Sequence, residues 1–187
     1  MSNQSALLVM DMQNGIVGSL SNSSEIIDKN KKAIESARKH QIPVIFVRVA
    51  FSKGFHEVSP HNKSFSRIKA SGQQMSVNDA STQIIDELAP NEDEVVVTKH
   101  RFSAFTGSNL EVLLRGMQVE HLILTGVVTS GVVLSTLVEA ADKDFELTVL
   151  SDAMTDRDLE AHQFLIDKIF PRYAEVTETL EWSNTIV

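Results

Sequence analysis

The stretch LILTGVVTSGVVLST, residues 122–136, decides the fold of this chain. Its first part, residues 122–125, is apolar apart from one threonine and is typical of a buried parallel strand. Gly126 ends that strand, and an apolar-periodic helix is expected to begin near Gly131 after a short turn. A helix that begins directly after a strand points free backbone N–H groups and partial positive charge at the sheet edge. The sequence therefore predicts an anion or oxyanion pocket at this turn.

Apolar runs of strand length alternate with helical patterns along the rest of the chain. Further strands are expected at residues 6–10, 44–49, 94–98 and 147–150, with a short edge strand at 173–176. Amphipathic helices are expected near residues 24–40, after a capping box that begins at Asn22, and near residues 79–88 and 157–169. A further helix is expected after a second capping box, which begins at Ser108. Because strands and helices alternate throughout, the pattern predicts one domain over residues 1–187, with a doubly wound parallel sheet under helices on both faces.

Composition narrows the function classes. The chain has 17 Lys and Arg against 25 Asp and Glu, a net charge of −8, which argues against a general nucleic-acid surface. No apolar run approaches the roughly 20 residues of a membrane span, and the N-terminus lacks the basic and apolar parts of a signal peptide, so a cytoplasmic protein without membrane contact is expected. The chain has no cysteine, which excludes disulfides and a thiol nucleophile.

Residues 50–78 form a long polar stretch without sustained periodicity. It concentrates basic and histidine side chains, namely Lys53, His56, His61, Lys63, Arg67 and Lys69. Phe51, Phe55 and Phe65 are too apolar for a free loop, so we expect it to cover the crevice as a lid or to contact another subunit, in a homodimer or homotetramer. The alternative is a merely solvated loop.

Reactive groups stand at the ends of the predicted strands: Asp11, Lys99 and the turn at residues 126–132. Ligands of open parallel sheets bind at the carboxyl ends of the strands, so we expect these groups to converge in one crevice. Burial of Asp11 would raise its pKa, and a nearby ammonium would lower it. Such a pair can transfer a proton while the N–H groups of the turn stabilise negative charge. A structural ion pair is the alternative.

Three motifs in this order, LVMDMQN (8–14), KHRFSAF (99–105) and TGVVTSG (125–131), resemble the isochorismatase-like hydrolase superfamily. The resemblance runs from residue 6 to about 180 and implies a Rossmann-like three-layer α/β/α sandwich with six parallel strands in the order 3-2-1-4-5-6. In the nicotinamidases and N-carbamoyl-amide hydrolases of that superfamily an Asp, a Lys and a Cys are catalytic. Asp11 and Lys99 match the first two. The resemblance also implies a cis peptide bond before Thr129 that helps to shape an oxyanion hole.

Val132 stands where those relatives carry the nucleophilic cysteine. A valine cannot attack a carbonyl group, so thiol-based amidase chemistry is excluded here. Ser130 and Ser135 lie near this position, but neither matches it, and no base is evidently placed to activate them.

Isochorismatases, which belong to the same superfamily, need no nucleophile because they split a vinyl ether by protonating carbon and adding water. We therefore predict a small-molecule hydrolase in which Asp11 is the acid and Lys99 holds Asp11 or a substrate carboxylate. Val128 stands where isochorismatases usually carry a tyrosine, so the substrate stays open.

Weaker predictions concern substrate contacts and bound groups. Gln13, Arg48 and Ser130 are candidate substrate-binding residues, and Arg48 together with the basic loop at 53–69 would hold substrate carboxylates. His162 is interpreted as a half-buried packing residue and His56 and His61 as surface residues, so no metal site is predicted. No cofactor is predicted, since the Gly-x-Gly-x-x-Gly fingerprint of dinucleotide binders is missing.

Two other functions stay open. One is an inactive family member that binds a metabolite or a partner, and the other is an amide or carbamoyl hydrolase with a nucleophile other than cysteine. A Rossmann-like nucleotide binder is disfavoured without the glycine fingerprint.

Overall fold

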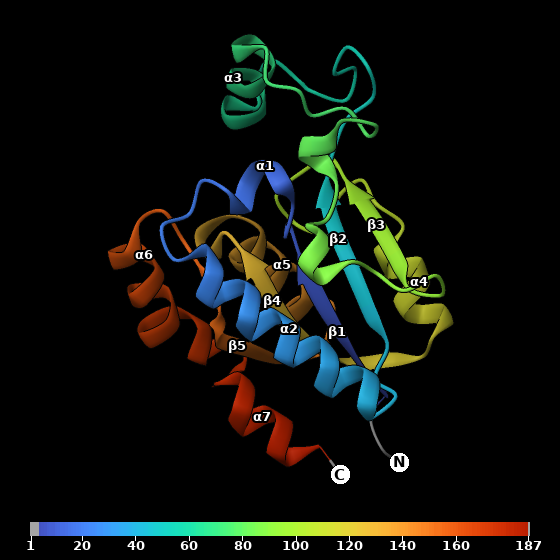
Figure 1. The fold of residues 1–187 in the computed structure, drawn as a ribbon, viewed down its shortest axis with the longest axis vertical. Coiled ribbons are helices and arrows are strands. Elements are labelled where there is room, and N and C mark those ends of the chain that lie inside the picture. Colours follow the sequence, from blue (N-terminus) through green and yellow to red (C-terminus); the bar gives the residue numbers. More distant parts are fainter. Residues whose placement is uncertain (1–3, 187) are drawn as a thin grey trace.

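Six parallel strands form the sheet of the protein, in the order β3-β2-β1-β4-β5-β6 (Figure 1), in a computed structural model that describes residues 4–186. The strands are β1 (Gln4–Met10), β2 (Val44–Val49), β3 (Val95–Lys99), β4 (Val119–Val127), β5 (Glu146–Thr155) and β6 (Glu175–Thr177). The α-helices are α1 (Asn14–Val17), α2 (Ser23–Lys39), α3 (Lys63–Ser71), α4 (Leu110–Gly116), α5 (Leu134–Ala141), α6 (Leu159–Phe164) and α7 (Thr179–Thr185). The predicted fold class and strand order are confirmed.

Two apolar clusters, one on each face of the sheet, explain why β1 is the central strand. Its side chains alternate between the faces, so that Leu8 and Met10 join the cluster under α4 and α5, while Leu7 and Val9 join the cluster under α2 and α7. Both faces of β1 are fully buried, which is why its sequence is a continuous apolar run.

Gly126 allows β4 to lie close against β1. Its φ of +121° belongs to a region that L side chains rarely adopt, and a Cβ at this position would overlap the backbone of Met10. Gly126 is paired with Met10 in the sheet, so the carboxyl ends of these two strands meet where the strand order reverses. A glycine is therefore required at the end of the deciding stretch, although β4 continues one residue past it, to Val127.

The stretch predicted as an irregular loop contains a helix. The segment between Ser52 and Gly72, here called the arm, includes α3 and projects from the end of the sheet (Figure 1). The short helix was missed because its residues are mostly polar, yet Asn62 caps it by accepting a hydrogen bond from Phe65 N.

Three other local predictions were wrong. The expected helix at 79–88 is two single 3-10 turns, η1 (Ala80–Thr82) and η2 (Asp86–Leu88). Asn22 precedes α2 without capping it through its side chain, and Asn109, not Ser108, is the N-cap residue of α4. Two short π-helical segments, η3 (Thr129–Val133) and η4 (Leu165–Ile169), and a third 3-10 turn, η5 (Phe170–Arg172), complete the described helical elements. Within residues 4–186, none of the helices has the length and apolar character that crossing a membrane demands.

Candidate active site

Asp11 and Lys99 form a buried ion pair at the carboxyl ends of β1 and β3, as predicted. Lys99 Nζ lies 3.0 Å from Asp11 Oδ2, and the two side chains are only 2% and 8% exposed. Lys99 Nζ also donates a hydrogen bond to the carbonyl oxygen of Arg101, at 2.9 Å. The second contact fixes the ammonium beside the carboxylate, so the pair has one defined geometry.

The second carboxylate oxygen of Asp11 is unusual, because Oδ1 is buried and has no hydrogen-bond partner among the described residues. Burial raises the pKa of Asp11 and outweighs the opposing effect of the charge and hydrogen bond of Lys99, so the pKa lies above its usual value. Asp11 also adopts a φ of +56°, in the left-handed region that Asp tolerates better than most residues. The arrangement favours a carboxyl group that can carry a proton on Oδ1.

A cavity of about 240 Å³ opens beside this pair. Most of its wall is apolar and includes Val128 and Val132, the residue at the nucleophile position of the resembled hydrolases. The cavity also contains Arg157, whose Nη2 donates a hydrogen bond to Ser19 Oγ and which forms no ion pair with any described residue. Arg157 is a cavity cation that the sequence analysis did not single out; its place directly after β5 is the signal that was overlooked.

The arm supplies one wall of the cavity through Phe65 and Ile68. Gln73 and Met75, which follow the arm in the sequence, extend the lining. Phe65 is held by Phe51 at 5.4 Å and by Phe102 at 5.0 Å between ring centroids. The arm therefore packs over the crevice of its own chain, as expected for a segment that covers the crevice. A subunit contact, and with it the homodimer or homotetramer, stays a prediction.

The basic side chains of the arm do not line this cavity. Lys69, for example, donates to the carbonyl oxygen of Phe55 instead. The structure therefore does not place the basic groups of the 53–69 loop at the cavity, and a contact between them and a substrate stays a prediction. The arm's apolar residues are the ones that face the cavity, because they pack against the sheet end while the charged groups keep their hydration.

Asp156 and His162, which were not predicted as site residues, form hydrogen bonds with the turn after β4. Ser130 donates to Asp156 Oδ2 through its backbone N at 2.8 Å and through Oγ at 2.6 Å. Thr129 Oγ1 lies 2.8 Å from His162 Nδ1, so His162 contacts the turn and is more than a packing residue. Burial lowers the pKa of His162, although Asp156 and Asp167 oppose that shift.

These contacts change the expected roles of the turn residues. Thr129 and Ser130 do not line the cavity, and Ser130 N and Gly131 N are already bonded to Asp156 and to Val128 O. The structure therefore does not place Ser130 against the cavity, and its backbone N–H is bonded to Asp156 and not directed at an oxyanion position. The cis peptide bond is Val127–Val128, one residue before the position that the resemblance implied.

Two other predicted substrate contacts, Gln13 and Arg48, lie outside the lining of this cavity. Gln13 is fully buried, and its amide bonds the backbone of Val49 and Thr82, so it ties the end of β2 to the 3-10 turn η1. Arg48 does not line the crevice; it lines a different cavity. Gln13 follows Asp11 by two residues, and Arg48 lies in β2 between the strands that lead to Asp11 and Lys99. The sequence pattern therefore placed both residues at the site.

No group of three or more His, Asp or Glu side chains within residues 4–186 has the geometry to hold a metal ion. The groups that line this site are a carboxyl group, an ammonium, a guanidinium and a mostly apolar wall.

Fold and site together define a parallel α/β protein with a crevice and a buried Asp–Lys pair at the carboxyl ends of its strands. The family model named Isochorismatase domain matches residues 5–181, and the chain belongs to the isochorismatase family. It is 28% identical over 183 residues to the isochorismatase family protein YwoC of Bacillus subtilis, covering 98% of this chain and 94% of YwoC. It is 31% identical over 170 residues to the ureidoacrylate amidohydrolase RutB of Yersinia enterocolitica, covering 80% of this chain and 74% of RutB.

Solved structures agree with this assignment. An isochorismatase family protein from Burkholderia thailandensis has a TM-score of 0.82 and 26% identity, covering all of this chain (100%) and 97% of that one. A cysteine hydrolase from Pseudomonas syringae has a TM-score of 0.88 at 23% identity, with 98% of this chain and 92% of that chain covered, and shows the shared fold. The protein is thus an isochorismatase-family hydrolase whose own chain contains no cysteine.

Proposed function

We propose that this hydrolase cleaves a small anionic substrate by acid catalysis at Asp11, without a covalent enzyme intermediate, and that an enol ether is the substrate class it fits best. The observation that carries the proposal is the unpaired Oδ1 of Asp11 in a buried carboxyl group with a raised pKa. A general acid needs a proton on an oxygen that the substrate can reach. Oδ2 is occupied by Lys99, so Oδ1 is the oxygen that would deliver it.

The reaction balances with water alone. Asp11 would transfer its proton to the terminal carbon of R–O–C(=CH₂)–COO⁻, which leaves an oxocarbenium ion. Water would add to the carbon that bears the ether oxygen, and the hemiketal would collapse to R–OH and a 2-oxo acid while a proton returns to Asp11. Lys99 would stabilise the carboxylate that Asp11 becomes after the transfer, which is when the ion pair is strongest.

The cavity wall supports an anionic substrate with an apolar body. Arg157 is the cation in the wall without a carboxylate partner among the described residues, and a guanidinium binds carboxylates through paired hydrogen bonds. Val128, Val132 and Phe65 provide the apolar surface opposite. We infer that Arg157 positions a substrate carboxylate, the role for which Arg48 was considered from sequence.

Amide or carbamoyl hydrolysis is the second candidate, because the relative at 31% identity is a ureidoacrylate amidohydrolase. In this chain a hydroxyl would have to replace the missing thiol. Thr129 is fully buried and bonded to His162, Ser130 is bonded to Asp156, and neither lines the cavity. These contacts favour the enol-ether mechanism, in which no nucleophilic side chain is needed.

The test is an assay of the purified protein against matched panels of enol-ether carboxylates, amides and carbamoyl compounds. Release of a 2-oxo acid whose methyl group carries one deuterium when the reaction runs in D₂O would show protonation at carbon. Ammonia release from the amide panel alone would overturn the proposal, and so would inertness toward all three panels, which would point to the binding function. Asp11→Asn should remove the activity, and Asp152→Asn is its matched control, since Asp152 pairs with Lys29 outside the cavity.

A further inference from the structure

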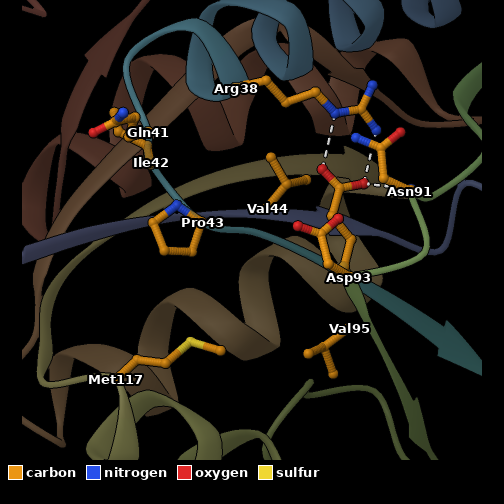
Figure 2. A pocket seen from close by; sticks show the side chains of 10 residues that line it. Arg38, Gln41, Ile42, Pro43, Val44, Asn91, Asp93, Val95 and Met117 are labelled. Atoms are coloured by element: carbon orange, nitrogen blue, oxygen red, sulfur yellow. Dashed lines mark hydrogen bonds and ion pairs between the residues drawn. The ribbon is translucent and has the colours of Figure 1, made fainter.

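Arg38 and Arg48 each line a cavity beside the β2–β3 edge of the sheet, but they differ in their partners. The cavity of Arg38, about 420 Å³, lies at the amino ends of these strands, between Val44 and Val95 (Figure 2). Arg38 donates to both carboxylate oxygens of Glu94, at 2.8 and 2.7 Å. The hydrogen bond with Glu94 raises the pKa of Arg38. That cation is already paired with a carboxylate, so Arg38 offers no unpaired positive charge to an anionic ligand.

Arg48 has no such partner. Its Nε donates to Thr98 Oγ1 at 3.1 Å, and its Nη1 donates to Gln83 Oε1 at 2.9 Å, both of which are uncharged acceptors. No carboxylate forms an ion pair with it in the part of the chain that the structure describes. Burial lowers the pKa of Arg48, as expected for a half-buried cation without a nearby anion. The other residues of β2 are apolar, so partial burial of the Arg48 charge among them costs free energy.

The guanidinium of Arg48 is also held in place. The side-chain amide of Gln83 donates to the carbonyl oxygens of Val77 and Asp79, which orients its Oε1 toward the arginine. Two hydrogen bonds then fix the guanidinium plane and leave donors on Nη1 and Nη2 at its outer end. A preorganised fork of this kind matches the two oxygens of a carboxylate.

The cavity of Arg48 measures about 270 Å³ and shares no lining residue with the crevice at Asp11. Its other walls are Gln83 and three apolar residues, Ile84, Pro90 and Val96. The wall at Ile84 is braced, because Gln83 O accepts from Asn14 N at 3.1 Å and Ile85 N donates to Met12 O at 3.0 Å. One cation beside an apolar wall suits an organic monoanion better than a phosphate, which carries more charge and no apolar surface.

We propose that this cavity is a second binding site, separate from the catalytic crevice, for a small carboxylate with an apolar body. The carboxylate binds end-on to Nη1 and Nη2 of Arg48, and the apolar body lies against Ile84, Pro90 and Val96. The inference does not depend on the reaction that the crevice catalyses.

Benzoate is the probe, measured by isothermal titration and by the rise in melting temperature. Wild-type protein binds it, and Arg48→Gln weakens the affinity by about tenfold or more, because a charge-assisted pair is lost. Val96→Glu also weakens it, since this 40% exposed residue tolerates a charge that pairs with Arg48 and repels the probe. Arg172→Gln, at an arginine of η5 outside these cavities, leaves the affinity unchanged. Benzylamine, with the same ring and the opposite charge, does not bind.

Three results would overturn the proposal: no binding of benzoate to wild type, equal affinity in Arg48→Gln, or loss of binding in Arg157→Gln in place of Arg48→Gln. The last result would locate the probe in the catalytic crevice. A crystal of the benzoate complex adds a direct readout, in which the carboxylate lies beside Arg48.

Discussion

Asp11 and Lys99 are joined across β2: Asp11 follows β1 and Lys99 ends β3, the two strands that flank β2, and their charged groups lie 3.0 Å apart. Asp11 N donates to Val47 O in β2, and Lys99 is paired in register with Val49 of the same strand. The sheet therefore sets the separation of acid and ammonium. Because Lys99 pairs with Oδ2, Oδ1 is the oxygen of Asp11 that is left for chemistry.

Activity should fall as the pH rises. Burial, the largest influence, raises the pKa of Asp11 above its ordinary value despite Lys99. An acid must be protonated to act, so kcat/KM is highest below the raised pKa and is lost as the pH passes through it. Asp11→Asn should lower the rate by about 10² to 10⁴-fold, because an amide of similar shape delivers no proton. A pH–rate profile that rises across this range would contradict the assigned role.

Arg157→Gln should raise KM about tenfold for a carboxylate substrate while kcat changes little, since the interaction holds substrate and transition state alike. The matched control is the same substrate as its neutral methyl ester, for which wild type and variant should agree. Steady-state kinetics with both substrates separate the charge effect from a change in cavity shape. An equal loss for acid and ester would show that Arg157 acts only by packing.

Gly126→Ala should destabilise the fold by about 3 kcal/mol or more, because the new Cβ would overlap the Met10 backbone at a φ of +121°. Gly72→Ala is the control, with a φ of +72° and no atom within 4 Å of the new Cβ. Only the conformational cost of about 1 kcal/mol is expected there. Urea unfolding measures both, and similar losses would contradict the close approach of β4 to β1.

Asp156→Asn should loosen the turn at Thr129 and Ser130. Burial raises the pKa of Asp156, but the hydrogen bonds from Ser130 and from the backbone of Asp158 and Arg157 outweigh it, so the pKa is lowered. A lowered pKa means that the charged form stabilises the fold above the unfolded value of about 3.9, and that this contribution is lost as the pH falls through the folded pKa. The variant should lack this acid-range loss and should exchange the Ser130 amide proton faster. Unchanged exchange would show that Asp156 does not hold the turn.

The sequence predicted the sheet and the ion pair well because both depend on local patterns. Apolar runs give buried strands, and parallel strands place the residues that follow them at one edge, which brings Asp11 to Lys99. Contacts between segments that are far apart in the sequence could not be predicted from these local patterns. Nothing near Arg48 in sequence shows that Gln83 and Pro90 enclose it, and His162 reaches Thr129 only because α6 folds back over the turn.

Substitutions at Val132 separate the two mechanisms. If Asp11 acts as the acid without a covalent intermediate, Val132 contributes only its apolar surface and its backbone, so Val132→Ala should retain most of the native activity. If Val132→Ala abolishes activity as fully as Asp11→Asn, the noncovalent mechanism is wrong.

Val132→Cys is the converse experiment. The new thiol would lie in the wall of the same cavity as Asp11 and Lys99, on the first turn of a helix, where an ammonium and the helix N-terminus both favour the thiolate. Its pKa should therefore lie below the ordinary value of about 8.5, measurable as the pH dependence of alkylation by iodoacetamide. Ser135→Cys, in the following helix and outside the cavity lining, is the matched control and should alkylate with an ordinary pKa. If the scaffold retains the geometry of a thiol amidase, Val132→Cys should also gain carbamoyl or amide cleavage that iodoacetamide abolishes. A thiol of ordinary pKa at position 132 would show that this crevice does not activate a nucleophile.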